Sequence, residues 1–182
     1  IIAYPMYQEM LRLGLSVVSV HKGFPGQVSQ AEAEFVKTTD LEVATRDWPD
    51  LDFVVYHSGY FPPPGDGISL FLQDIAAMGP RENLYAEVGS TFANSLFSPD
   101  AAAHLLGQLM DALGSARIVW GTDSVWWGSP QWQIDALKVL QIPESMQEEF
   151  GYPPLNDCDK ERILGLNAAD LYGVDVEAAR GE

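Results

Sequence analysis

The chain has 182 residues, and its 26 acidic residues against 10 Lys and Arg give a formal net charge of -16. This charge argues against nucleic acids and anionic membranes as partners, because binding to either needs an excess of Lys and Arg. Hydrophobic residues make up 47% of the chain and charged residues 20%, which is typical of a folded globular protein and excludes a disordered acidic tail.

Short β-branched or aromatic segments alternate with longer amphipathic ones along the chain. The short segments, which we expect to be strands, are residues 15–20, 51–56, 84–88 and 117–120. Each follows a segment that we expect to be a helix, and these are residues 5–13, 41–48, 69–78 and 100–113. Because parallel neighbours need a crossover connection, the alternation predicts an α/β fold with a parallel sheet.

After the last predicted strand the pattern indicates helices only. These are residues 130–140, 143–150, 156–166 and 168–172. No low-complexity linker separates them from the preceding part. We therefore expect one domain over residues 1–182.

The cysteine content and the first residues of the chain indicate the cellular compartment. Cys158 is the only cysteine, which excludes an internal disulfide framework and a cysteine-built zinc knuckle. No stretch approaches the roughly 18 apolar residues of a membrane helix. The first seven residues lack the basic and apolar regions of a signal peptide. We expect a cytoplasmic protein.

A residue suited to metal or proton chemistry stands at the end of each predicted strand. These residues are His21, His57, Glu87 and Asp123, and they are separated by 36, 30 and 36 residues. Such a spacing is about one βα unit, so all four should emerge at the carboxyl-end face of the sheet. Active sites of parallel α/β sheets and barrels lie at this face.

Two histidines and an aspartate suit a divalent metal such as zinc or manganese. Such an ion can hold a water molecule of lowered pKa, and a neighbouring aspartate can accept the proton of that water as a general base. A histidine at a strand end can instead be a hydrogen-bonded structural residue. His104, in the middle of a predicted helix, is expected to be structural.

Four segments of the sequence resemble a known family. The segments are VSVHKGFP, FVVYHSGY, IVWGTDSVWWGSP and ILGLNAADLYGV. They are similar to the second half of the amidohydrolase superfamily barrel, in particular to the branch called amidohydrolase 2. That branch includes metal-dependent hydrolases and non-oxidative decarboxylases that resemble aminocarboxymuconate-semialdehyde decarboxylase. The resemblance implies a (β/α)8 TIM-barrel type of fold, of which this chain holds about strands 5 to 8 and the carboxyl-terminal helices.

The resemblance also implies roles for three residues. His21, after the fifth barrel strand, corresponds to a metal ligand, and Asp123, after the eighth, to a metal ligand and base. His57, after the sixth, corresponds to a residue that contacts substrate or activates water. Glu87 receives no role from the family, and we expect a buried carboxylate that holds a neighbouring loop or ligand side chain.

The family's first strand contributes a His-x-His pair that this sequence lacks. A complete barrel also needs roughly 200 residues or more. We therefore expect about 100 or more further residues before Ile1 in the natural protein, carrying strands one to four and the missing pair. The alternative is a half-barrel that completes itself by pairing as a homodimer.

Aromatic residues gather in the segments that follow the predicted strands. They are Phe24, Tyr60, Phe61, Phe92, Trp126 and Trp127. Such walls suit a small organic carboxylate, which Lys22 could pair with through its charge. The candidate substrate-binding residues are Lys22, Phe24, Tyr60 and Trp126. The same rings could instead pack the last helices against the barrel mouth.

The predicted function is hydrolysis of a small organic substrate by metal-activated water, with zinc as the first candidate metal and manganese as the second. Non-oxidative decarboxylation of a small aromatic or unsaturated carboxylate stays open, because both reactions use a metal to stabilise developing charge. A non-enzymatic α/β ligand-binding module is the third alternative.

Overall fold

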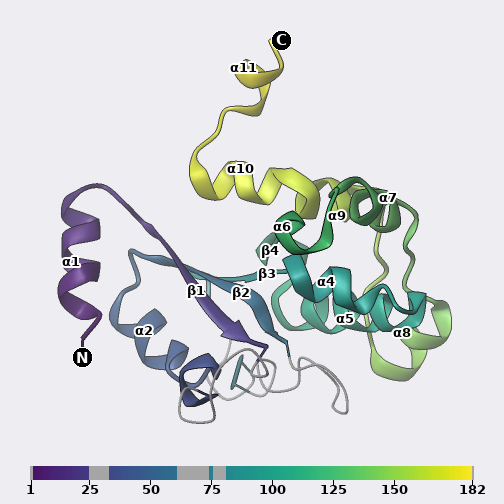
Figure 1. Cartoon of the computed structure of the whole chain (residues 1–182), viewed down its shortest axis with the longest axis horizontal. Helices are drawn as coiled ribbons and strands as arrows, with labels where there is room; N and C mark the ends of the chain where they lie inside the picture. Colours follow the sequence, from purple (N-terminus) through teal and green to yellow (C-terminus); the bar gives the residue numbers. More distant parts are fainter. Residues whose placement is uncertain (1, 25–32, 61–73, 76–80, 182) are drawn as a thin grey trace.

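The computed structural model of the chain describes residues 2–24, 33–60, 74–75 and 81–181 (Figure 1). Within these residues, parallel strands form one sheet in the order β1-β2-β3-β4. The strands are β1 (Val17–Gly23), β2 (Asp52–Tyr60), β3 (Leu84–Glu87) and β4 (Ile118–Val119). From β2 onward, each strand pairs with the strand that precedes it in the sequence. The predicted parallel α/β sheet is therefore confirmed.

The helices before the strands also agree with the prediction. They are α1 (Tyr4–Arg12), α2 (Leu41–Asp47) and α5 (Pro99–Leu113). The helix expected over residues 69–78 lies largely outside the described residues. The start of α5 shows why the helix begins there, because Ser98 Oγ accepts the backbone N–H of Ala101 at 3.2 Å and proline occupies the first helical position.

After β4 the predicted helical region is present. It contains α7 (Gln131–Val139), α8 (Glu144–Phe150), α9 (Asp157–Glu161), a π-helical turn (Arg162–Leu166) and α10 (Asn167–Tyr172). Shorter elements were not predicted from the sequence. They are α4 (Gly89–Ser95), α6 (Ser124–Trp127), α11 (Val176–Arg180) and the 3-10 turns Ala33–Val36 and Ser115–Arg117.

The main core lies on one face of the sheet. The strand register places Val55 beside Ala86 and Ala86 beside Ile118, and these fully buried side chains share one apolar cluster with residues of α1, α2 and α5. The opposite face is partly open, since Tyr56 of β2 is 41% exposed. Helices outside and an open inner face are what a segment of a barrel shows.

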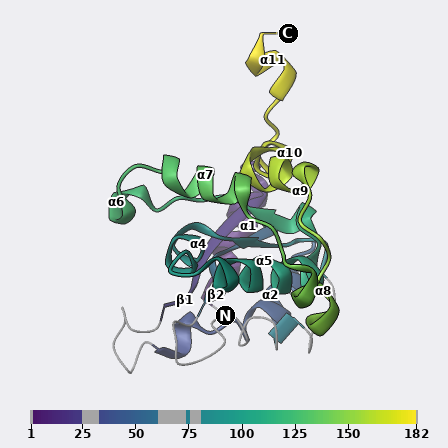
Figure 2. The same cartoon turned by 90° about the vertical axis from the view of Figure 1, so that its right-hand side faces the viewer.

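The carboxyl-terminal helices gather beside β4. In Figure 1, α7, α9 and α10 form this group, whereas α11 stands apart from the rest of the chain, and Figure 2 shows α10 and α5 on opposite sides of the sheet. Asn167 joins the group to β4, because its Nδ2 donates to the carbonyl oxygens of Ser115 and Ile118 at 2.7 Å each. None of the helices in the described ranges has the length and apolar character that crossing a membrane requires.

Candidate active site

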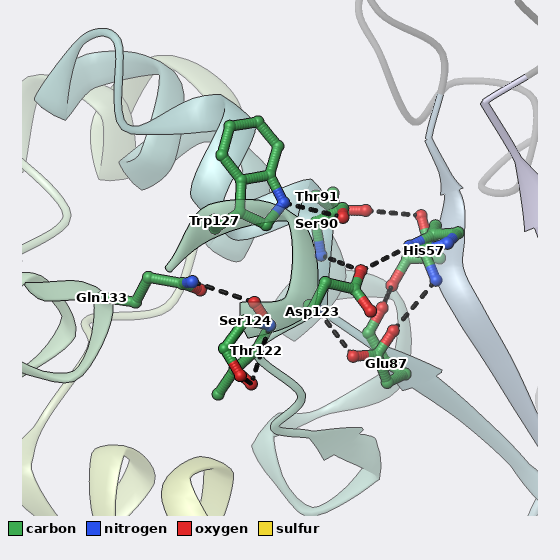
Figure 3. A network of polar contacts seen from close by, with 11 residues as sticks. His57, Glu87, Ser90, Thr91, Thr122, Asp123, Ser124, Trp127 and Gln133 are labelled. Atoms are coloured by element: carbon green, nitrogen blue, oxygen red, sulfur yellow. Dashed lines mark hydrogen bonds and ion pairs between the residues drawn. The ribbon is translucent and has the colours of Figure 1, made fainter. Parts of the chain in front are cut away.

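The first part of the candidate site is a left-handed turn at the end of β2. His57, Ser58 and Gly59 have φ angles of 66°, 51° and 65°. Left-handed backbone at a residue other than glycine costs about 1 to 3 kcal/mol and persists only where the surroundings hold it. Glu87 Oε2 accepts the backbone N–H of His57 at 3.1 Å, and Thr91 Oγ1 donates to the His57 carbonyl oxygen at 2.8 Å (Figure 3).

Asp123, just beyond β4, is the second part. It also has a left-handed backbone, with φ 46°. Its Oδ2 accepts the backbone N–H of Ser90 at 2.8 Å and lies 3.5 Å from Nδ1 of His57. That nitrogen is buried and makes no hydrogen bond, so the His57–Asp123 contact is electrostatic rather than a well-formed hydrogen bond. Figure 3 shows the Asp123 carboxylate between Ser90 and the His57 imidazole.

Glu87, the last residue of β3, lies buried between these two parts, with 8% of its surface exposed. Its Oε1 accepts the backbone N–H of Gly89 at 2.6 Å. Burial raises the pKa of Glu87 to about 7, and this outweighs the hydrogen bonds from His57 and Gly89, which lower it. Gly121 makes room for the carboxylate, because a Cβ there would lie 1.7 Å from Oε1.

Desolvation lowers the pKa of His57, whereas it raises that of Glu87. The His57 pKa is lowered from the ordinary value of 6.5, chiefly by desolvation and further by His21, while Asp123 opposes the shift. A histidine with such a pKa is a neutral imidazole at pH 7. One of its ring nitrogens therefore carries a proton and the other a free lone pair.

His21, His57 and Asp123 line one cavity of about 350 Å³, whose other walls are Phe24, Ser90, Trp126 and Trp127. The rings of His21 and His57 meet edge to face with centroids 4.7 Å apart. The volume suits a small organic molecule. The structure thus brings the three residues predicted for the metal and the chemistry to one place at the carboxyl ends of the strands.

The predicted substrate-binding residues divide into two groups. Phe24 and Trp126 line the cavity. Tyr60 is buried and its hydroxyl accepts a hydrogen bond from Asn94 at 3.3 Å, and it does not belong to the cavity wall. Lys22 lies on the other face of β1 from His21, since neighbouring strand residues point to opposite faces.

The Lys22 ammonium is bound by other residues of the fold. Its Nζ lies 2.8 Å from Asp40 and donates to the carbonyl oxygen of Phe35 at 3.0 Å. Lys22 therefore does not face the cavity as expected, because its side chain lies on the other face of β1 and is bound to Asp40.

The remaining aromatic residues and His104 have other places. Phe92 is fully buried and packs against Trp120 at a centroid distance of 5.4 Å, and Phe61 lies outside the described residues. His104 is on α5, where its Nδ1 is 2.9 Å from the hydroxyl of Tyr152. This hydrogen bond agrees with the predicted structural role of His104.

Sequence reasoning missed the contribution of α4. The backbone N–H of Ser90 binds Asp123, and Ser90 Oγ accepts the indole N–H of Trp127 at 2.9 Å. Thr91, the next residue, holds His57. The run Gly89-Ser90-Thr91, separated from Glu87 by Val88, was the available signal, because small hydroxyl residues favour helix starts.

A comparison of sequences identifies the family. The model of the amidohydrolase family called amidohydrolase 2 matches residues 2–174. The chain belongs to this amidohydrolase family. The family is one of enzymes, the amidohydrolases, which confirms the prediction of an enzyme. The search of curated proteins found no match to this chain.

Solved structures share the fold at low sequence identity. A Pseudomonas putida protein named for 2-pyrone-4,6-dicarboxylic acid hydrolysis has a TM-score of 0.56 and 20% identity, with 95% of this chain and 68% of that chain covered. An uncharacterised TIM-barrel protein from Bordetella bronchiseptica has a TM-score of 0.54 and 19% identity, with 94% and 50% covered.

A third neighbour is a dihydroxybenzoic acid decarboxylase from Polaromonas, with bound manganese and the inhibitor 2-nitroresorcinol. Its TM-score is 0.54 at 13% identity, with 93% of this chain and 53% of that chain covered. The chain thus spans about half to two thirds of the length of these solved neighbours. The sheet corresponds to part of a TIM barrel, as the sequence predicted.

The residues present fit part of a metal site. His21 and Asp123 offer the imidazole and carboxylate donors that zinc and manganese accept, and both face the same cavity. In the described part of the chain, no group of three or more His, Cys, Asp or Glu side chains lies close enough to hold an ion. An ion held by His21 and Asp123 would therefore need further ligands besides the described residues.

Proposed function

We propose that this amidohydrolase is a metal-dependent hydrolase that acts on a small organic molecule in the cavity of His21, His57 and Asp123. The observation that carries the proposal is the pairing of a neutral, partly buried imidazole with a carboxylate, 3.5 Å apart, in the wall of that cavity. His21 and Asp123 would hold the metal, with zinc as the first candidate. When bound, a divalent metal supplies a water of lowered pKa and stabilises negative charge on the substrate.

The protein's own groups divide the remaining work. Asp123 accepts the proton of the attacking water, and the Ser90 N–H keeps its carboxylate turned toward the cavity. His57 carries one ring proton, through which it can donate a hydrogen bond to the scissile group, and desolvation keeps that imidazole neutral. Phe24 and Trp126 offer ring faces to the body of the substrate.

Decarboxylation is the second candidate function. It is favoured by the aromatic walls of the cavity and by the Polaromonas neighbour, a decarboxylase that binds the aromatic inhibitor 2-nitroresorcinol. Loss of CO₂ leaves a carbon that must receive a proton. Asp123 can accept a proton from water and pass it to this carbon, while the hydroxide left behind combines with CO₂ to form bicarbonate. The same residues therefore serve either reaction.

Kinetics on the full natural chain, loaded with zinc or manganese, test both candidates. Hydrolysis is measured on 2-pyrone-4,6-dicarboxylate, and CO₂ release on 2,6-dihydroxybenzoate. We expect Asp123→Asn to lower turnover by about two orders of magnitude or more, since it removes the base. His104→Gln is the matched control, because His104 lies on α5 away from the cavity. Near-normal turnover of fully loaded Asp123→Asn contradicts the proposal.

A further inference from the structure

The turn that carries His57 is not held by the sheet. The β1–β2 register is regular up to His21 and Tyr56 and shifts before Gly23 and Tyr60. On the other side, the β2–β3 pairing ends at Val55. The left-handed residues 57–59 therefore lie where neither neighbouring strand fixes them by regular ladder pairing.

Side chains of the β3–α4 corner, residues 87–91, hold the His57 backbone instead. The carboxylate of Glu87 accepts the N–H of His57, and the hydroxyl of Thr91 donates to its C=O, at 3.1 and 2.8 Å. In return, Ser58 Oγ donates to the backbone carbonyl oxygen of Glu87 at 2.7 Å. Both polar groups of the His57 peptide units are thus bound by buried partners, since Glu87 and Thr91 are both buried.

The same corner also holds the partner of His57. Glu87 Oε1 binds the N–H of Gly89, and the next N–H in the chain, that of Ser90, binds Asp123. A Cβ at Gly89 would come within 2.5 Å of the Glu87 carboxylate and 3.1 Å of the Asp123 carboxylate, so this part of the backbone lies directly between the two acids. One carboxylate therefore links the backbone positions that place His57 and Asp123.

We propose that Glu87 and Thr91 are positioning residues that hold the left-handed backbone of His57 and so place its imidazole against Asp123. The proposal rests on the proposed function in one respect, namely that His57 and Asp123 are the reacting pair. The corner acts through backbone hydrogen bonds and does not itself touch the substrate. Loss of the hydrogen bond to the His57 N–H or of the one to its C=O lets the turn relax. The imidazole then leaves its contact with Phe24 and Asp123.

Thr91→Val is the main variant, because it keeps the shape of the side chain and removes only the hydroxyl. Thr45→Val is its matched control. Thr45 is also buried, and its Oγ1 donates to the carbonyl oxygen of Leu41 at 2.7 Å, far from the cavity on α2. Thr91→Ser restores the hydroxyl and should restore the behaviour of the natural chain.

The first readout is structural and independent of activity. In the full natural chain, NMR reports the Overhauser contact between the rings of His57 and Phe24, whose centroids are 4.9 Å apart. We expect Thr91→Val to weaken this contact at least twofold and both Thr45→Val and Thr91→Ser to keep it. If Thr91→Val changes it no more than Thr45→Val does, the proposal is overturned.

The second readout is kinetic. With His57 displaced and the cavity walls intact, we expect Thr91→Val to lower kcat about tenfold with KM within twofold, while Thr45→Val keeps both. An unchanged kcat in Thr91→Val overturns the positioning role. Failure of the hydrolase or decarboxylase assignment is recognised separately by Asp123→Asn, and the NMR contact then still tests the positioning of His57.

Glu87→Gln examines the other end of the His57 peptide by hydrogen exchange. A glutamine amide has one acceptor oxygen, so it cannot accept from both His57 and Gly89 in the present geometry. We expect the amide proton of one of these two residues to exchange at least tenfold faster than in the natural chain. Full protection of both amides in Glu87→Gln contradicts the proposal.

Discussion

Gly121→Ala is the sharpest stability experiment that the structure offers. The added Cβ would lie 1.7 Å from Oε1 of Glu87 and 2.8 Å from its Cδ, so the carboxylate has to move. The φ of Gly121 is outside the left-handed range, and alanine therefore adopts its backbone without strain. The effect of the substitution is confined to the collision with Glu87.

The magnitude follows from the hydrogen bonds that the carboxylate loses. Glu87 accepts from Gly89 at 2.6 Å and from His57 at 3.1 Å. At pH 8, above the Glu87 pKa of about 7, each bond to this charged group contributes about 1.5 to 3 kcal/mol. Alanine gains about 0.4 to 1 kcal/mol over glycine through the lower entropy of the unfolded chain. With both bonds weakened and partial relaxation, we expect a net loss of about 3 kcal/mol in the free energy of unfolding.

Urea unfolding with linear extrapolation measures this loss. Gly165→Ala is the control, because nothing lies within 4 Å of the added Cβ in its helical turn, and we expect it to be neutral or to stabilise by up to about 1 kcal/mol. In a Glu87→Ala background the cost of Gly121→Ala should largely disappear, because the colliding group is gone. The reasoning is refuted if Gly121→Ala unfolds within about 0.5 kcal/mol of the natural chain.

Three further predictions concern Glu87, Trp126 and Lys22. The pKa of Glu87 is raised from 4.5 to about 7 in the fold, so its contribution to stability is present below pH 4.5 and is lost as the pH rises to about 7. The free energy of unfolding should therefore be lower at pH 8 than at pH 5, by at most about 3 kcal/mol from this group. In Glu87→Gln this part of the pH dependence should be absent. Trp126 is 80% exposed at the cavity, and Trp126→Ala should raise KM about three- to tenfold while leaving the urea midpoint unchanged. Lys22→Met should leave KM within twofold, because the ammonium is bound to Asp40. A large rise in KM would contradict this and indicate that Lys22 binds the substrate.

The positions of His21, His57 and Asp123 could be predicted because they depend on the repeat of the βα unit. A polar residue directly after an apolar strand has little freedom, since the strand's direction and the parallel order fix where it emerges. The same alternation could have excluded Lys22. Adjacent strand residues face opposite sides, so His21 and Lys22 cannot both enter one cavity by their side chains.

The left-handed turn could not be predicted from local sequence. Of its three residues, only Gly59 has an intrinsic preference for positive φ, whereas His57 and Ser58 take that conformation because Glu87 and Thr91 bind the backbone from the next βα unit. The short helix α6 follows Asp123, whose backbone is also left-handed and whose side chain accepts the N–H of Ser90. At His57 and Ser58, tertiary hydrogen bonds override local propensity.

The in-sequence order of the strands has a kinetic consequence. Each strand pairs with its predecessor, and the bonds that assemble the site join residues only 30 and 33 positions apart, His57 to Glu87 and Ser90 to Asp123. Moderate sequence separations of this kind shorten the search for native contacts. The contact of His57 with Asp123, however, needs both of these bonds. During refolding, the contact of the Trp127 indole with Ser90 should mark the joining of β3 and β4, because α4 follows β3 and α6 follows β4.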